Sequence, residues 1–347
     1  MKRWRGRIRR KIQTRLIANN YLNPQVLHSR HSRREISGVL LLDKPARISS
    51  NQALQSARRM FAAAKAGHTG TLDPMATGLL PICFGEATKF SSFLLGADKI
   101  YDATLRLGYI STTGDAEGEI SPASTVADRE YPDMELTLAR LGPVLQSFIG
   151  PIMQKPPMYS ALKHQGKPMY RYAREGVVVE RQPRQVFIHD LHLQTVTNDE
   201  VRIVVKCGSG TYIRTLAEDI GKALGWGGAY LTALRRTALD DFEVTKAHTL
   251  EAIGNVPLVQ RDHCLLSTDS LVQNLPGATL DIAAAASLRQ GRAVENYEAG
   301  RSLIEGEKVR LYNQEKHFLG LGEITARGEI APKRLVNSPV CPLEAGH

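Results

Sequence analysis

The chain contains few cysteines, and they are not arranged as metal or disulfide frameworks usually are. Four cysteines are scattered over 347 residues, and no two of them form a Cys-x-x-Cys pair. These spacings indicate neither a zinc site nor a disulfide network. Reduced, buried thiols in a cytoplasmic protein are the simplest interpretation, so we expect a cytoplasmic location.

Long apolar runs are missing as well. No segment approaches the roughly 20 apolar residues that a membrane-spanning helix needs, so we expect no membrane segment. The first residues are basic rather than apolar, which does not fit a secretory signal peptide. The hydrophobic content of 42% is that of a globular protein, and the length allows two domains with a large core.

Acidic residues are absent from the N-terminal stretch. Residues 1–34 contain eleven Lys and Arg and no Asp or Glu, so the formal net charge of +10 is concentrated there. We expect residues 1–35 to form a disordered basic arm that attracts nucleic acid through its phosphates. Three other interpretations stay open: a solvated tail without a partner, an extension from a misassigned start, and an Arg-rich organellar transit peptide.

Several catalytic signatures are also lacking. The patterns HExxH, GxSxG and GxxxxGK[ST] do not occur, and no second carboxylate is placed with Asp73 as a glycosidase would require. The turn Gly208-Ser209-Gly210 is no dinucleotide fingerprint, because Ile213 stands where the last glycine is needed. We therefore expect no metal and no cofactor, which leaves nucleophilic or acid–base chemistry by side chains.

The most unusual stretch that is present spans residues 66–80. It holds three glycines, a proline, His68 and the single carboxylate Asp73, and an apolar run follows at 79–84. Pro74 biases Asp73 toward extended backbone. We expect Asp73 to lie on a stiff loop held by the core. An aspartate in such a loop is ordinarily a turn or cap residue, so a functional role needs further support.

Apolar periodicity predicts an alternation of strands and helices that is typical of an α/β (α+β) protein with a mixed sheet. Expected strands are residues 36–45, 79–84, 101–107, 177–179, 185–195 and 201–207, and expected helices are 50–61, 86–95, 135–149 and 216–224. Residues 109–124 read as a polar loop, and 230–236 as either a helix or a strand.

The composition changes near residues 274–277, and glycine turns with short apolar segments follow. Residues 309–312 and 318–324 are expected strands of a small β-rich domain of about 60 residues, close to the lower size limit for independent folding. We expect a catalytic domain over residues 36–272 and this second domain over 273–340.

Six motifs, in order along the chain, carry a resemblance to a known family. They are residues 38–45 (GVLLLDKP), 67–78 (GHTGTLDPMATG), 99–101 (KIY), 157–163 (PMYSALK), 210–215 (GTYIRT) and 234–236 (LRR). Together they resemble the TruB family of tRNA pseudouridine synthases, over residues 36–336. Ser209 departs from the lysine that many relatives carry there.

The resemblance implies a mixed-sheet pseudouridine synthase core in which Asp73 is the catalytic nucleophile. Asp73 would attack the target uridine at the ribose C1′ or at C6 of the ring, a choice left open. Arg214 would pair with Asp73 and lower its pKa, since a nearby cation favours the ionised acid. Tyr101 would pack on the uracil and take or relay the C5 proton.

Further roles are implied around these residues. Tyr212 and Leu234 would line the uridine pocket, and Lys44 would hold the loop or a phosphate. His68 would lie against bases of the tRNA T loop, where an imidazole can occupy the stack that the flipped uridine leaves. The C-terminal β-rich segment resembles a PUA-type RNA-binding domain.

The expected function is cofactor-free isomerisation of uridine to pseudouridine at position 55 in the T loop of tRNA, with no obligate protein partner. Two alternatives stay open. One is a tRNA-binding or tRNA-folding protein without catalysis. The other is a guide-RNA-dependent pseudouridine synthase subunit of a multiprotein particle.

Overall fold

The computed structural model describes residues 33–123, 134–197, 199–295 and 304–340. The predicted disorder of the basic arm concerns residues that lie almost wholly outside this range. Arg34, the last basic residue of that arm, belongs to the folded body: it forms a β-bridge with Ala63 and donates to Asp262 Oδ1 at 3.1 Å.

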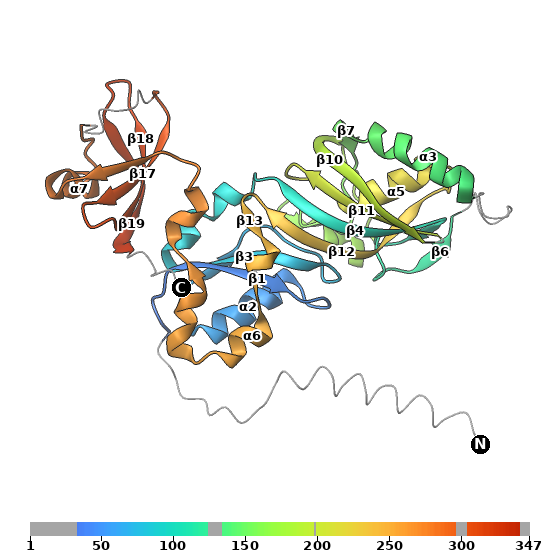
Figure 1. The fold of residues 1–347 in the computed structure, drawn as a ribbon, viewed down its shortest axis with the longest axis horizontal. Coiled ribbons are helices and arrows are strands. Elements are labelled where there is room, and N and C mark those ends of the chain that lie inside the picture. Colours follow the sequence, from blue (N-terminus) through green and yellow to red (C-terminus); the bar gives the residue numbers. More distant parts are fainter. Residues whose placement is uncertain (1–32, 124–133, 198, 296–303, 341–347) are drawn as a thin grey trace, which may run out of the picture. The chain divides into compact units, whose positions relative to one another are not determined.

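One mixed sheet organises the body of the protein, as the alternation of elements predicts (Figure 1). Its strand order is β14-β1-β3-β12-β4-β11-β10-β7. The strands are β1 (Gly38–Lys44), β3 (Thr77–Phe84), β4 (Lys99–Leu107), β7 (Gly150–Gln154), β10 (Arg184–Thr197), β11 (Glu200–Cys207), β12 (Ala229–Leu239) and β14 (His248–Thr249). The pairs β3–β12 and β1–β14 are parallel, and the other neighbours along this order are antiparallel.

The two faces of β1 are both covered, which explains its unbroken apolar sequence. Leu40 and Leu42 pack on one face with Ala57 of α2 (Ser50–Met60) and Ile253 of α6 (Leu250–Asn255). Val39 and Leu41 belong to a separate apolar cluster on the other face. Strand β4 instead alternates buried and half-buried residues along its whole length, as its sequence predicts.

Two further helices accompany the strands β10, β11 and β12 (Figure 1). They are α3 (Met134–Ser147) and α5 (Ile213–Ala223). Leu216, Ala217 and Ile220 turn the apolar face of α5 into the main core cluster. The helix begins at Ile213 rather than at the expected Leu216, so Arg214 stands in its first turn.

The expected helix over residues 86–95 is wrong in type. Two short 3₁₀ helices stand there, η1 (Gly85–Lys89) and η2 (Ser91–Leu94), separated at Phe90. Phe90 is fully buried and its ring contacts Phe318 with centroids 5.3 Å apart. Burial of Phe90 and Leu94 thus sets the backbone here, in place of intrinsic helix preference.

Three other segments differ from the expectation or resolve it. No strand forms at residues 177–179, where Val178 is 83% exposed and has no neighbouring strand to pair with in the described chain. The polar loop 109–124 contains a hairpin of β5 (Tyr109–Ser111) and β6 (Ile120–Pro122). Residues 230–236 are strand, as part of β12.

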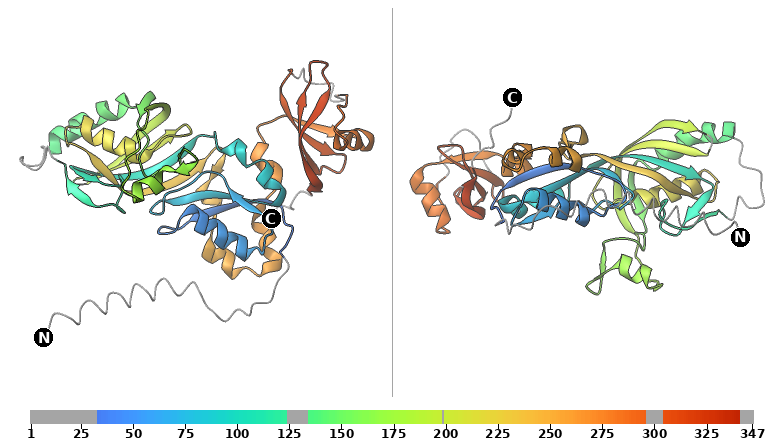
Figure 2. Two further views of the ribbon diagram at one scale, coloured as in Figure 1. Left: turned by 180° about the vertical axis from the view of Figure 1, so that it is seen from behind. Right: turned by 90° about the horizontal axis from the view of Figure 1, so that it is seen from below.

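The remaining short elements complete the body. They are β2 (Ala66–His68), β8 (Lys163–His164), β9 (Lys167–Pro168), α4 (Met169–Arg174), β13 (Phe242–Glu243), η3 (Val244–Lys246), η4 (Leu258–Cys264), β15 (Leu265–Leu266) and η5 (Thr268–Val272). The hairpin β8–β9 is a sheet of its own, and α4 follows it directly (Figure 2). Within the described residues, no helix combines the length and apolar character needed to cross a membrane.

A second, four-stranded sheet forms the β-rich C-terminal domain that composition predicts. Its order is β16 (Gly277–Leu280), β17 (Lys308–Asn313), β18 (Phe318–Ile324) and β19 (Ile330–Val340), with α7 (Ile282–Arg289) between the first two strands. Val309, Leu311 and Leu319 contribute to its own apolar cluster. Phe318 and Val336 instead join the cluster that contains Val39 and Leu41 of β1.

Gly78 gives a test of the sheet beneath the Asp73 loop. Its φ of +100° disfavours any side chain, and a Cβ there would lie 2.2 Å from the carbonyl oxygen of Arg236 in the adjacent strand. We expect Gly78→Ala to lower the free energy of unfolding by more than about 2 kcal/mol. Urea unfolding measures this.

Gly254→Ala is the matched control, because that helical glycine has only an ordinary contact at 3.8 Å. It should be neutral or stabilising by up to about 1 kcal/mol. A Gly78→Ala protein within about 0.5 kcal/mol of wild type would contradict the close approach of β3 and β12.

Candidate active site

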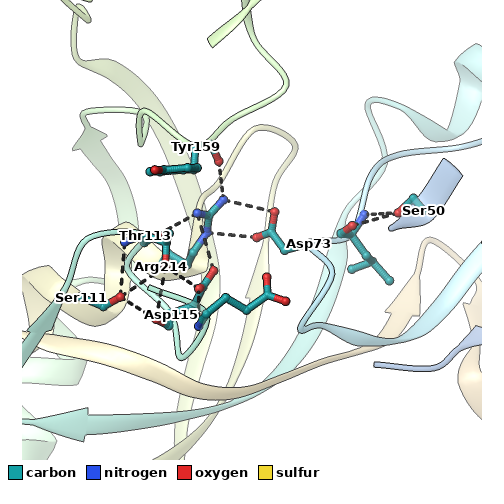
Figure 3. Close-up of polar contacts among 9 residues, drawn as sticks. Ser50, Asp73, Ser111, Thr113, Asp115, Tyr159 and Arg214 are labelled. Atoms are coloured by element: carbon teal, nitrogen blue, oxygen red, sulfur yellow. Dashed lines mark hydrogen bonds and ion pairs between the residues drawn. The ribbon is translucent and has the colours of Figure 1, made fainter. Parts of the chain in front are cut away.

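Asp73 lies on the loop between β2 and β3, and α2 holds this loop (Figure 3). The buried Ser50 hydroxyl donates to the Leu72 carbonyl at 2.9 Å and accepts from the Leu72 amide at 2.8 Å. The Arg47 amide donates to the Pro74 carbonyl at 2.8 Å. Backbone on both sides of Asp73 is therefore tied to the core, as the Gly/Pro-rich sequence predicts.

Lys44 supports the same loop from β1. Its ammonium donates to the carbonyls of Pro45, Ile48 and Pro74 at 2.8, 2.7 and 3.3 Å. The residue is fully buried, and burial lowers the pKa of Lys44 to about 8, against the opposing effect of nearby acids. Lys44 is expected to hold either the loop or a phosphate. Its ammonium contacts the loop at the Pro74 carbonyl, and its burial leaves it inaccessible to a phosphate.

Arg214 and Asp73 form a bidentate ion pair (Figure 3). The Nε–Oδ2 distance is 3.0 Å and the Nη2–Oδ1 distance 3.2 Å. The same guanidinium donates to the Thr113 and Tyr159 carbonyls at 2.8 and 2.7 Å, so three loops meet on it. Arg214 is 5% exposed and the Asp73 side chain 33% exposed, which leaves part of the carboxylate accessible to another molecule.

Asp115 is a buried acid of this site that the sequence analysis did not single out. Its Oδ2 lies 3.7 Å from Arg214, and its Oδ1 accepts from the Thr113 hydroxyl at 2.6 Å and the Glu117 amide at 3.1 Å. In the sequence it is one acid among many polar residues at 109–124. No local pattern there distinguishes it from a turn aspartate.

The net pKa of Asp73 is raised above its ordinary value of 3.8, although Arg214 by itself lowers it, as the pairing predicts. Burial is the largest cause, and the like charge of Asp115 adds to it. Arg214 and Lys44 act in the expected direction but do not outweigh desolvation. At Asp73 the loss of hydration on burial therefore raises the pKa more than the neighbouring cations lower it.

Tyr101 stands on the buried face of β4, where it is 8% exposed. Burial raises the pKa of the phenol, and the charge of Asp73 raises it further, whereas Arg236 lowers it. The net direction is upward from 10, so Tyr101 is a neutral phenol at neutral pH.

Tyr212 precedes α5, two residues before Arg214. Its amide donates to Gln154 Oε1 at 3.0 Å, its carbonyl accepts from Gln154 Nε2 at 3.3 Å, and the Arg184 guanidinium lies 5.2 Å from its ring centre. Its side chain is half-buried. Leu234 is buried on β12 opposite Ala103, two positions from Tyr101 along β4.

His68 ends the short strand β2 and is half-buried. Its Nδ1 atom is buried without a hydrogen-bond partner among the described residues. Burial lowers the pKa of His68, and the charge of Arg236 lowers it further, so the imidazole is neutral at neutral pH. No direct contact joins it to Asp73 in the described chain.

The described residues contain no group of three or more His, Cys, Asp or Glu side chains that could hold a metal ion. The chemistry that the arrangement offers is that of a partly exposed carboxylate held by a buried guanidinium, beside a neutral phenol. Such a carboxylate can act as a nucleophile.

Family models cover most of the folded chain. A model of the TruB family pseudouridylate synthase N-terminal domain matches residues 58–213, and models of TruB C-terminal domains match 214–273 and 276–336. Together with the fold and the paired Asp–Arg site, they define a pseudouridylate synthase.

Curated relatives are similar over nearly their whole length. A tRNA pseudouridine synthase B of Nitrosospira multiformis is 63% identical over 88% of this chain and 97% of its own. One from Nitrosomonas europaea is 52% identical over 86% and 95%. The chain belongs to the TruB family.

Solved structures share the fold at lower identity. The chain aligns with a Cbf5–Nop10–Gar1 complex at a TM-score of 0.62 and 25% identity, over 88% of this chain and 85% of that one. An H/ACA RNP bound to a substrate RNA containing 2′-deoxyuridine gives 0.63 at 22% identity, over 87% and 85%. The mixed-sheet pseudouridine synthase fold is therefore shown.

Asp115 provides a test of the buried network. Asp115→Ala removes the acceptor of two hydrogen bonds and leaves Arg214 with less compensation, so we expect a loss of about 3 kcal/mol in the free energy of unfolding. Glu119→Ala, at an exposed acid of the same loop, should change it by less than about 0.5 kcal/mol. Equal effects of the two substitutions, measured by urea unfolding, would show that Asp115 is merely a loop residue.

Proposed function

We propose that this protein isomerises uridine to pseudouridine at position 55, in the T loop of tRNA, with Asp73 as the nucleophile. The observation that carries the proposal is the Asp73 carboxylate, which is one-third exposed and held by the buried Arg214 through one hydrogen bond and a second ion-pair contact. Relatives named tRNA pseudouridine synthase B, up to 63% identical, support tRNA as the substrate.

The reaction exchanges one bond for another. The bond from N1 to the ribose C1′ breaks, and a bond from C5 to C1′ forms. C5 loses a proton and N1 gains one, so the base is rearranged without net oxidation or reduction. Asp73 would add to C1′ or to C6 and leave again, which suits a carboxylate because it is also a competent leaving group. We infer that no cofactor is required.

The target base must leave the RNA stack to reach Asp73. Flipping costs a few kcal/mol, which stacking and hydrogen bonds in the pocket offset. We assign the aromatic wall of the pocket to Tyr101 and Tyr212 and its apolar floor to Leu234. His68, which is neutral and has a buried nitrogen without a partner, would contact the RNA bases beside the flipped uridine.

The β-rich C-terminal domain would be a PUA-like module that grips tRNA by shape and phosphate contacts. The basic residues before position 35 would add affinity without sequence specificity. We place the reaction in the cytoplasm, on free tRNA and without an obligate protein partner.

The decisive experiment offers the purified chain an unmodified tRNA transcript with no other protein or RNA. Formation of pseudouridine at position 55 removes both alternatives, the non-catalytic tRNA-binding protein and the guide-dependent subunit. Binding without turnover would support the first alternative. Turnover only after a guide RNA is added would support the second.

Asp73→Asn should reduce tritium release from C5-labelled uridine in tRNA to background, because an amide is no nucleophile for this step. Affinity for tRNA should stay within about threefold of wild type, since one side chain of a large interface changes. Asp199→Asn, at a remote ion pair with Arg106, is the control and should retain full turnover. Substantial turnover by the Asp73 variant would contradict its role.

The raised pKa of Asp73 predicts a pH profile. The ionised acid is the reactive form, so the single-turnover rate should rise with pH through a pKa above 3.8. Arg214→Gln removes a lowering influence and should move this acid limb to higher pH. Asp115→Asn removes a raising influence and should move it to lower pH.

Arg202→Gln, at an exposed ion pair with Asp102, is the control for this profile and should leave the limb in place. Shifts of the same sign in the Arg214 and Asp115 variants would exclude Asp73 as the titrating group.

A further inference from the structure

Arg236 is a buried cation that the site described above does not use. It is 1% exposed and lies in the middle of β12. In the described part of the chain no carboxylate lies within ion-pair distance of it, and its Nη2 is buried without a hydrogen-bond partner. Burial of a guanidinium without a neighbouring acid lowers the stability of the fold, so packing alone does not explain this arginine.

The backbone around Arg236 fixes where its side chain can go. The residue is paired with Tyr101 of β4 on one side and with Gly78 of β3 on the other. Its Nε donates to the Leu79 carbonyl at 2.7 Å. The absence of a side chain at Gly78 permits this approach, as a Cβ there would clash with the Arg236 backbone.

From this position the guanidinium reaches both parts of the site. Its charge favours the ionised form of the Tyr101 phenol, and the two residues are paired across β12 and β4. Its Nη1 lies 3.7 Å from where a Cβ of Gly70 would stand, three residues before Asp73. One buried side chain thus lies beside both the strand that carries Tyr101 and the loop that carries the nucleophile.

We propose that Arg236 is a positioning residue for pseudouridine formation, which packs beside Tyr101 and the Asp73 loop and keeps them in one arrangement. The inference rests on the proposed function. Strand pairing places Arg236 beside Tyr101, and the bond from its Nε to the Leu79 carbonyl fixes the guanidinium against β3.

Arg236→Lys is the informative variant. It keeps the buried charge and the aliphatic stem, so the fold should survive, but an ammonium lacks the planar fork that bonds the Leu79 carbonyl and extends toward Gly70. We expect the single-turnover rate on saturating tRNA to fall about 10- to 100-fold. The tRNA dissociation constant should stay within about threefold, and the Tm within a few degrees of wild type.

Arg235→Gln is the matched control on the same strand. That side chain is 40% exposed and pairs with Asp43 at 2.7 Å, and it contacts neither Tyr101 nor Gly70 in the described structure. Its rate should equal that of wild type. A second readout is a double-mutant cycle with Tyr101→Phe. If Arg236 acts through the hydroxyl, Arg236→Lys should slow the Tyr101→Phe protein much less than it slows wild type.

The outcomes separate cleanly. A wild-type rate for Arg236→Lys overturns the inference. A lower rate accompanied by an equally large loss of Tm or of tRNA affinity also overturns it. If the Tyr101→Phe protein has no measurable rate, the double-mutant cycle cannot be used. The test is then whether Arg236→Lys lowers the single-turnover rate while the tRNA dissociation constant stays near that of wild type. If the wild-type chain itself makes no pseudouridine in tRNA, the proposed function fails. Active wild type with an equally active Arg236→Lys protein rejects this inference alone.

Discussion

The ion pair between Arg214 and Asp73 is the interaction on which the rest of the site depends. Arg214 is buried, and burial of a guanidinium is costly unless its charge and its donors are compensated. Asp73 supplies the opposite charge and accepts one hydrogen bond, and the carbonyls of Thr113 and Tyr159 accept others. The same contacts that stabilise the arginine therefore hold three loops around one partly exposed carboxylate.

The groups around Asp73 act on its pKa in opposite directions. Arg214 and Lys44 favour its ionised form, whereas Asp115 and burial oppose it. A pocket that removes a base from water must itself be largely dry, and dryness raises the pKa of any acid within it. Asp115 has a second effect, because its proximity adds negative charge beside the buried Arg214.

The sheet supplies the rigidity that a positioned site requires. Strands β3, β4 and β12 are neighbours, so Gly78, Tyr101 and Arg236 meet although they are far apart in sequence. The loop before β3 carries Asp73, and α5 follows β11 with Arg214 in its first turn. Tyr101, Leu234 and Arg214 thus stand on regular elements, whereas Asp73 and Asp115 stand on loops that are held by hydrogen bonds.

The sequence by itself determined the alternation along β4, the helix that became α2, the loop before an apolar strand and, through six ordered motifs, the family. The structural features among these are local, because periodicity and turn chemistry act between residues that are near in sequence. Each motif is likewise a short continuous stretch of sequence. Only the tertiary structure decided the role of Asp115, the position of Arg236, the 3₁₀ turns around Phe90 and the upward direction of the Asp73 pKa. Each of these depends on burial or on distances between residues that are remote along the chain, such as Arg214 and Asp73, 141 positions apart. Such distances follow from how the strands pair, and local sequence pattern does not contain them.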